Sequence, residues 1–426
     1  MELPINYGGK REIVKISDEN ILGILTPPTF KKRQVDLAPS INDATAFLES
    51  HRRILVLIND YTRPTLNQPF LLPLLPLLIS RNTKILICLG THRSANEKEL
   101  KAILGPEVFS TLRSSIVQHS ARDRSSLFLL GKTSFGTKVF LNRYLLWADA
   151  IFTINSIEPH YFAGYTGGRK CFVPGCAGYE TTINNHNLLL DPASAPLSLL
   201  GNPVHLDMTE AARMIPKPIF SIQIVQDVNH HILSVYWNDL FQSFEAACAD
   251  AYHLFARPIK ERAEIVLSVL QPPYDINFYQ AQRAQEFSLY ALREGGIQIT
   301  VSRCHQGVGN DEFVQVLANC VTPDRLLTKE NSHHPGWHKA ARIARALQKG
   351  KLYTVMGVED TIIKSCFMTP FRSISAALAA AFRELGNRAR LYIIPDAGTV
   401  VPIPENQQPE DNKRKVLTSP CPLLKL

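Results

Sequence analysis

The chain has 426 residues, of which 45% are hydrophobic and 20% are charged. These ordinary globular values exclude a disordered, collagen-like or coiled-coil chain, and at roughly 100–200 residues per domain the length favours two domains. An excess of Lys and Arg gives a net charge of +8 and a pI near 9.0. On composition alone, that charge could serve nucleic acid, a membrane surface or a phosphate-bearing small molecule.

The eight cysteines are scattered without a CxxC pair, whereas zinc sites show close paired spacing. We therefore interpret them as mostly buried thiols in a reducing compartment. The N-terminus, MELPINYGGKREIVKI, carries charges where a signal peptide needs an apolar core, and we therefore expect a cytoplasmic protein. The apolar stretch from Phe70 to Ser80 contains two prolines and is about half the length of a membrane-spanning helix. We expect it to form a buried helix or packing segment.

Short apolar runs recur along the chain and predict strands at Ile54–Ile58, Lys84–Leu89, Ala150–Ile154, Phe220–Val225, Ile265–Leu270, Ile297–Val301, Tyr353–Met356 and Leu391–Ile394. Both faces of these runs look apolar, which is typical of parallel strands covered by helices on both sides. Helix-like segments lie between them at Glu97–Leu104, Leu240–Arg257, Tyr279–Arg293, His338–Gln348 and Ser373–Leu385.

This alternation predicts an α/β fold with two domains, each built on a mostly parallel sheet flanked by helices. We place an N-terminal domain at residues 1–262 and a C-terminal domain at 263–400. The proline-rich residues 401–426 are expected to be a tail that is at the surface or partly disordered, and several of the basic residues lie there.

Polar residues follow the first two predicted strands, where open α/β sheets bind ligands. Asp60, Thr62 and Arg63 offer a carboxylate, a hydroxyl and a guanidinium suited to an anion, although a simple turn with an Asp–Arg pair would look the same. His92 follows the second strand in Gly90-Thr91-His92-Arg93, and could act as an acid or base or be structural.

A third polar segment, from Asn155 to His186, is more specific. It contains His160, a Gly167-Gly168 turn before Arg169 and Lys170, and His186 on an expected helix. Two adjacent glycines let backbone amides approach an anion, while Arg169 and Lys170 would supply charge. A glycine-rich surface loop with solvated basic residues is the alternative, but it does not explain the histidines on both sides.

These residues resemble the motifs of the nickel-dependent lactate racemase family. The pattern EPH-x-FAG-x-x-GGRK matches Glu158–Lys170, and it is followed in order by Pro174-Gly175, Glu180-Thr181 and Asn185-His186. The family motifs D-x-TRP, G-x-HR and N-x-YQ match Asp60–Pro64, Gly90–Arg93 and Asn277–Gln280. The motifs span residues 59–283 and keep the family's order.

The resemblance implies a nickel-pincer nucleotide, a pyridinium mononucleotide with a thioamide and a thiocarboxylate, that is covalently attached to Lys170. It makes His186 the protein ligand of nickel, and His92 and His160 the two proton-transfer residues. Arg63 would hold the substrate. The residues implied to contact cofactor or substrate are Asp60, Tyr61, Thr62, Arg63, Gln280 and Arg283. Cofactor-synthesis enzymes would be maturation partners.

The implied reaction is racemisation or epimerisation of a 2-hydroxy acid, with hydride transfer to the cofactor and one histidine acting on each face of the substrate. Where the family has a lysine, this chain has Arg283, whose planar fork of donors favours a larger, dicarboxylic or sugar acid over lactate.

The three polar segments and Gln280–Arg283 fall in different expected domains, which predicts an active site in the interdomain cleft. The alternative is a non-catalytic protein that binds an organic anion or the cofactor. We expect no nucleic-acid or membrane partner, and the oligomeric state stays open.

Overall fold

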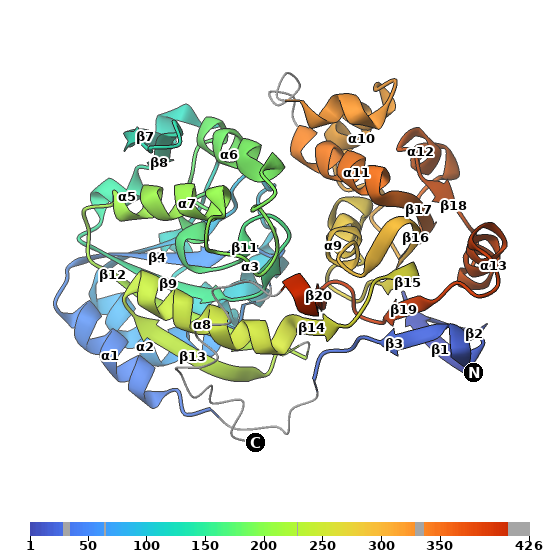
Figure 1. The fold of residues 1–426 in the computed structure, drawn as a ribbon. Helices are drawn as coiled ribbons and strands as arrows, with labels where there is room; N and C mark the ends of the chain where they lie inside the picture. The colour runs from blue at the N-terminus through green and yellow to red at the C-terminus, as the bar shows by residue number, and fades with distance from the viewer. Residues whose placement is uncertain (29–34, 64, 228, 329–335, 408–426) are drawn as a thin grey trace. The chain divides into compact units, whose positions relative to one another are not determined.

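The computed structural model describes residues 1–28, 35–63, 65–227, 229–328 and 336–407. It divides into two compact units (Figure 1). We call Thr29–Leu254 the inserted unit, and Met1–Pro28 together with Phe255–Pro409 the terminal unit. The predicted α/β class is confirmed, because each unit is built on a mostly parallel sheet that carries helices.

The sheet of the inserted unit has the strand order β13-β12-β9-β4-β5-β6 and is parallel except for the edge strand β13. Its strands are β4 (Arg53–Asn59), β5 (Asn82–Cys88), β6 (Ile116–Gln118), β9 (Ala150–Ser156), β12 (Ile219–Gln226) and β13 (Ile232–Asn238). Four of them coincide with predicted strands. Because β4 is parallel to both of its neighbours, β5 and β9, the loops after these three strands leave the same edge of the sheet.

The helices of this unit are α1 (Ala38–Glu49), α2 (Gln68–Ser80), α3 (Glu97–Leu104), α4 (Pro106–Thr111), α5 (Tyr144–Trp147), α6 (Tyr179–His186), α7 (Pro203–Arg213) and α8 (Leu240–Phe255). The apolar stretch from Phe70 to Ser80 is helix α2, as one of its two interpretations expected. Helix α3 begins where predicted, because Asn96 and Glu99 form a capping box that pairs the first backbone N–H groups.

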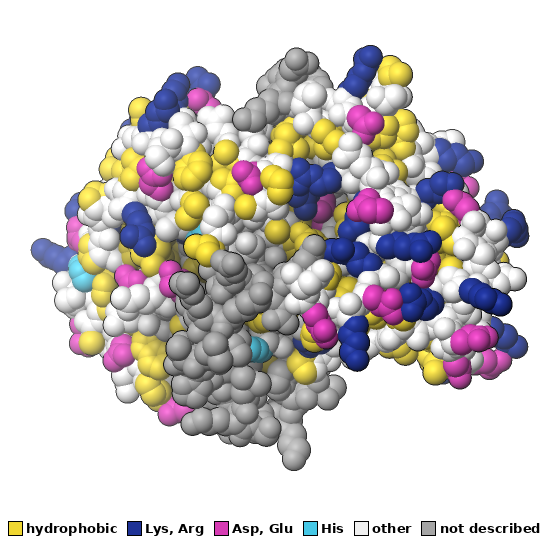
Figure 2. Space-filling model, in the orientation of Figure 1, with side chains coloured by type: hydrophobic (Ala, Val, Ile, Leu, Met, Phe, Trp, Pro, Cys, Tyr) yellow, Lys and Arg dark blue, Asp and Glu magenta, His cyan; other side chains and the backbone are white. Residues whose placement is uncertain are grey.

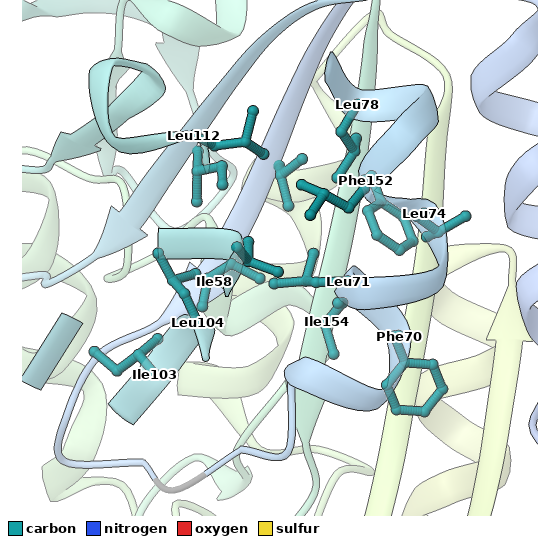
Figure 3. Close-up of a cluster of buried hydrophobic side chains, with 14 of the residues drawn as sticks. Ile58, Phe70, Leu71, Leu74, Leu78, Ile103, Leu104, Leu112, Phe152 and Ile154 are labelled. Carbon is teal, nitrogen blue, oxygen red and sulfur yellow. The ribbon is translucent and has the colours of Figure 1, made fainter. Parts of the chain in front are cut away.

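One face of this sheet forms the main hydrophobic core of the unit (Figure 3). Ile58 of β4, Phe152 and Ile154 of β9, and Leu74 and Leu78 of α2 are at most 1% exposed. The opposite face differs in part from the expectation of two apolar faces. It carries four fully buried polar side chains, Thr153, Asn155, Ser221 and Gln223, together with buried apolar ones such as Ile151. Because side chains alternate along a strand, β9 and β12 are apolar on the face toward the core and mixed on the other face.

The terminal unit contains a parallel sheet of order β18-β17-β16-β15-β19-β3. Its strands are β3 (Ile21–Ile24), β15 (Ala263–Val269), β16 (Leu292–Ser302), β17 (Gly350–Met356), β18 (Thr369–Pro370) and β19 (Leu391–Ile394). Here the structure differs from the expected domain bounds. Ile21 pairs with Leu391, so the first 28 residues belong with the C-terminal sheet rather than with residues 29–254.

Helices α9 (Phe278–Ser288) and α11 (Trp337–Lys349) pack on this sheet, as do α13 (Ile374–Leu385) and the hairpin of β1 (Glu2–Tyr7) and β2 (Lys10–Lys15). The short helices α10 (Asp311–Ala318) and α12 (Asp360–Ser365) complete the unit. The expected tail begins differently: Val401–Pro404 is a buried strand, β20, paired with β14 (Ala256–Ile259). Residues 408–426, the rest of that prediction, lie outside the described residues.

On the face of the molecule in Figure 2, Lys and Arg side chains lie among Asp and Glu side chains. Several exposed basic residues are paired in this way, for example Arg390 with Glu261 at 2.7 Å and Lys101 with Glu97 at 2.9 Å. No helix of the described part of the chain is both long enough and apolar enough to cross a membrane.

Two adjacent residues of α2 provide a test of the core. Leu78 is fully buried, whereas Ile79 is 54% exposed. We expect Leu78→Ala to lower the free energy of unfolding by about 2–5 kcal/mol, because it leaves a cavity against the sheet. Ile79→Ala, the matched control, should change it by no more than about 0.5 kcal/mol. Urea denaturation followed by circular dichroism measures both, and equal effects would contradict the packing of α2.

Candidate active site

Three loops at the carboxyl edge of the inserted unit's sheet are joined by hydrogen bonds. The Gly90 N–H, after β5, donates to the Gly175 carbonyl at 3.0 Å. The hydroxyls of Thr65, after β4, and Ser156, at the end of β9, lie 3.0 Å apart and are hydrogen bonded. The motif segments that lie far apart in the sequence therefore meet at one edge of the sheet. Pro64 of the first motif lies outside the described residues.

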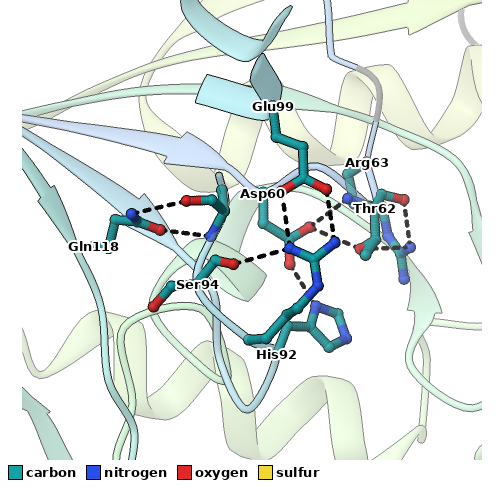
Figure 4. Close-up of polar contacts among 9 residues, drawn as sticks. Asp60, Thr62, Arg63, His92, Ser94, Glu99 and Gln118 are labelled. Carbon is teal, nitrogen blue, oxygen red and sulfur yellow. Dashed lines mark hydrogen bonds and ion pairs between the residues drawn. The ribbon is translucent and has the colours of Figure 1, made fainter. Parts of the chain in front are cut away.

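Asp60 and His92 form a hydrogen-bonded pair across two of these loops (Figure 4). The Asp60 carboxylate is 4% exposed, and its Oδ2 contacts Nδ1 of His92. Its Oδ1 accepts from the Thr62 backbone N–H at 3.0 Å and from the Thr62 hydroxyl at 2.7 Å. Burial raises the pKa of Asp60, but attraction to His92 and Arg63 and these hydrogen bonds outweigh burial, so the net pKa is lowered and the group is ionised.

The two arginines of these loops, Arg63 and Arg93, make contacts with other residues of the protein. Arg63 Nη1 donates to the carbonyl of Thr62 at 2.9 Å. Arg93 forms a two-pronged pair with Glu99 at 2.7 and 2.8 Å, and its guanidinium lies 4.2 Å from the ring centroid of Tyr61. The Arg93 charge is therefore already neutralised by Glu99, rather than held for an anion.

The ring of Phe162 is the point where the third loop and helix α6 meet. The ring centroid of Phe162 lies 4.6 Å from that of His160 and 4.9 Å from that of His186, and 5.8 Å from Nζ of Lys170. Phe162 is 1% exposed, so its ring is held in place by packing, and all three side chains lie next to it. The structure thus brings together the predicted proton-transfer residue, the predicted metal ligand and the predicted attachment lysine.

His160 is held in one orientation inside the protein. It is 7% exposed and stacks on Tyr161 with the ring centroids 4.8 Å apart. The Ala163 backbone N–H donates to its Nδ1 at 3.3 Å, so in the neutral ring the hydrogen is on Nε2. His92, with a side chain that is 32% exposed, makes its Nδ1 contact with a carboxylate instead. The two histidines therefore have different surroundings.

The orientation of His186 is determined by a buried network that sequence reasoning did not find. Asn185 Nδ2 donates to Asp207 at 2.8 Å and to the Val204 carbonyl at 3.1 Å, which fixes the amide oxygen toward Nδ1 of His186 at 3.2 Å. An amide oxygen only accepts, so His186 Nδ1 donates and the lone pair of the neutral ring is on Nε2. Asp207 also accepts from the hydroxyls of Thr133 and Thr137. Of this network, the motif singled out Asn185 alone, and nothing in the sequence pointed to Asp207, Thr133 or Thr137.

The glycine-rich loop does not form the anion cradle that its sequence indicated. The Gly168 N–H donates to Oε1 of Gln223 at 3.1 Å, on the polar face of the sheet. Arg169 is 1% exposed, and its guanidinium donates to the backbone carbonyls of Ala163, Tyr165 and Gly167 at 2.5, 2.9 and 3.3 Å. Burial lowers its pKa to about 10. Arg169 therefore holds the loop together instead of supplying charge to a ligand.

The cysteines near Lys170 are buried thiols, as expected. Sγ of Cys88 lies 3.4 Å from Sγ of Cys176, and the Cys171 thiol donates to the Gly168 carbonyl at 3.0 Å. Burial raises the pKa of Cys171 and of Cys176 well above the usual value. Within the described residues, no group of three or more His, Cys, Asp or Glu side chains lies close enough together to hold a metal ion.

Gln280 and Arg283 lie on α9 of the terminal unit. The Gln280 backbone N–H is capped by the Asn277 side chain at 2.9 Å. Arg283 is 4% exposed, donates from Nε to the Gly398 carbonyl at 2.6 Å, and has its guanidinium 4.2 Å from the ring centroid of Tyr274. Their contact with a cofactor or substrate stays a prediction.

These features define a two-unit α/β protein in which His160, Lys170 and His186 lie around one buried ring, on segments that follow a strand of a mostly parallel sheet. Two family models match it: the lactate racemase N-terminal domain over residues 7–196 and the lactate racemase C-terminal domain over residues 259–402. The chain belongs to the lactate racemase family.

Individual relatives match most of the chain. It is 28% identical over 426 residues to a lactate racemase of Thermoanaerobacterium thermosaccharolyticum, covering 94% of this chain and 98% of the relative. It is also 28% identical to a lactate racemase of Lactiplantibacillus plantarum, covering 82% and 84%. The lactate racemase apoprotein structure from T. thermosaccharolyticum superposes with a TM-score of 0.86 at 26% identity, over 94% of this chain and all of that one.

Two glycines test how tightly the Lys170 loop is packed. Gly167 and Gly201 both have positive φ, +77° and +70°. A Cβ at Gly167 would lie 2.3 Å from the Ile157 side chain, whereas nothing lies within 4 Å of one at Gly201. We expect Gly167→Ala to lower the free energy of unfolding by about 1–3 kcal/mol more than Gly201→Ala, since only the first adds a clash to the backbone strain. Chemical denaturation measures the difference, and its absence would argue against this loop packing.

Proposed function

We propose that this chain is a racemase or epimerase of a 2-hydroxy acid that works with a nickel-pincer nucleotide attached to Lys170. The observation that carries the proposal is the gathering of His160, Lys170 and His186 around the Phe162 ring. The relatives named lactate racemases support it, since they align over 94% and 82% of the chain.

The donors at this site fit the cofactor by their chemistry. Neutral imidazole is a good ligand for Ni²⁺, and the network through Asn185 leaves the His186 lone pair on Nε2, the nitrogen away from the amide. The Lys170 amine would provide the point of covalent attachment. When bound, the cofactor would supply the chemistry of a hydride acceptor for C2 of the substrate.

The protein's own residues would then bind the acid and move one proton. Arg63 would pair with the substrate carboxylate, which needs a charged donor in a partly buried site. One of His92 and His160 would take the proton of the 2-hydroxyl as the keto form develops, and the other would return a proton to the opposite enantiomer's oxygen. Phe162 and Tyr161, packed against His160, would help to exclude water from that step.

The substrate is proposed as a class. The relatives act on lactate by their names, whereas Arg283 in place of the family lysine brings more donors and favours a larger, dicarboxylic or sugar acid. The non-catalytic alternative, binding of an organic anion or of the cofactor alone, keeps the same site residues but predicts no turnover.

A chiral assay separates these possibilities. The cofactor-loaded enzyme would be incubated with single enantiomers of lactate, malate, phenyllactate and gluconate, and the products would be resolved by chiral chromatography. We expect inversion at C2 for at least one acid, and about 10²–10⁴-fold less for His160→Gln, because general acid–base catalysis contributes that much. No inversion by a fully loaded wild-type enzyme with this panel or further 2-hydroxy acids would favour the binding protein.

The attachment site is tested by intact-protein mass spectrometry. Protein produced together with cofactor-synthesis enzymes should carry a mass adduct that Lys170→Ala lacks, because no amine remains to form the bond. Lys138→Ala is the matched control, since Lys138 is 59% exposed and is paired at the surface with Glu180. An adduct that survives Lys170→Ala would rule out this lysine as the attachment point.

A further inference from the structure

The Asp60 carboxylate makes all of its described hydrogen bonds within the two loops that carry it and His92. Oδ1 is the acceptor for the backbone N–H and the hydroxyl of Thr62, and Oδ2 is in contact with Nδ1 of His92. Figure 4 shows the carboxylate between these groups, pointing to the His92 ring. The family resemblance implied that Asp60 contacts the cofactor or substrate, and that contact stays a prediction. The geometry also gives Asp60 a partner inside the protein, His92.

We propose that Asp60 is a positioning residue that holds neutral His92 in the tautomer with its hydrogen on Nδ1, so that Nε2 exchanges the proton with the substrate. The catalytic role of this tautomer rests on the proposed function, whereas the tautomer itself follows from the hydrogen bond alone. The reason is that an ionised carboxylate only accepts hydrogen bonds, so Nδ1 must donate. Nε2 then carries the lone pair that a general base needs.

The groups around His92 are consistent with an ionised Asp60. Arg63 attracts the carboxylate, and the guanidinium of Arg93 lies over the ring of Tyr61, whose centroid is 6.5 Å from that of His92. Glu99 neutralises Arg93. Asp60 is therefore the carboxylate in direct contact with the His92 ring in the described residues.

His160, on another loop at the same edge of the sheet, has the opposite tautomer. Its Nδ1 accepts from the Ala163 N–H, so the hydrogen of its neutral ring is on Nε2. With both rings neutral, His92 thus presents a lone pair on Nε2 and His160 presents an N–H. The resting site would then already contain one base and one donor, and the hydroxyl proton would first pass to His92.

Replacing Asp60 by asparagine should reverse the His92 tautomer. Two donors from Thr62 face Oδ1, so the amide oxygen stays on that side and the amide nitrogen faces His92. An NH₂ group donates, which forces Nδ1 of His92 to accept and moves the hydrogen to Nε2. The backbone shape is unchanged, because asparagine is nearly isosteric with aspartate.

The test is a long-range ¹H–¹⁵N spectrum of the apoprotein, at a pH where the histidines are neutral, with His92→Gln used to assign the signal. We expect the hydrogen on Nδ1 of His92 in the wild type and on Nε2 in Asp60→Asn, with His160 unchanged. Asp123→Asn is the matched control, since Asp123 caps Ser125 through the same N–H and hydroxyl pair but contacts no described histidine. A wild-type His92 with its hydrogen on Nε2 overturns the proposal even if Asp60→Asn does not fold.

The effect of Asp60 on catalysis is measured in a separate kinetic experiment. In the cofactor-loaded enzyme, Asp60→Asn should lower kcat by about 10²–10⁴-fold with little change in KM, because the base has the wrong tautomer. Full activity in a variant with the reversed tautomer would overturn the role of Asp60. If the wild type inverts no acid, the proposed function fails, whereas the tautomer assignment stands or falls on the spectra alone.

Discussion

The guanidinium of Arg169 holds the loop between His160 and Lys170 in one shape. A buried cation is costly unless its donors are paired, and Nη1 and Nη2 of Arg169 donate to the carbonyls of Ala163, Tyr165 and Gly167, which leaves Nε without a partner in the described residues. The loop therefore wraps around its own side chain. The ring of Phe244, 4.3 Å from the guanidinium, closes the other side. Lys170 directly follows this fixed point, so its position depends on the backbone that Arg169 holds.

The need to pair buried hydrogen-bond donors also explains the buried polar side chains on one face of the sheet. Gln223 accepts the Gly168 N–H, and Ser221 and Thr153 are hydrogen bonded at 2.8 Å beside it. An apolar residue at position 223 would leave a buried N–H without a partner, which costs about 1–3 kcal/mol. The polar face therefore fixes the loop to the sheet, while the apolar face of the same strands makes the core with α2.

The two histidines at this edge of the sheet differ because of the groups that face their Nδ1 atoms. His92 faces the ionised carboxylate of Asp60, and His160 faces a backbone N–H in an aromatic setting. A reaction that takes a proton on one face and returns it on the other needs two groups in different states at any moment. The hydrogen bonds of the two rings, to Asp60 and from Ala163, provide such a difference.

The sequence by itself determined the α/β class, the family and the eight predicted strands, four of which lie in the sheet of each unit. Apolar runs and motif spacing are local properties of the chain. Only the tertiary structure decided that Ile21 pairs with Leu391, that Asp207 orients His186 through Asn185, and that Arg169 is buried instead of facing a ligand. It also decided that Asp60 faces His92. Each of these is a contact between residues far apart in the chain or a choice of which way a side chain turns. Such contacts follow from how the sheet and its loops pack, which the pattern of residue types along the chain does not record.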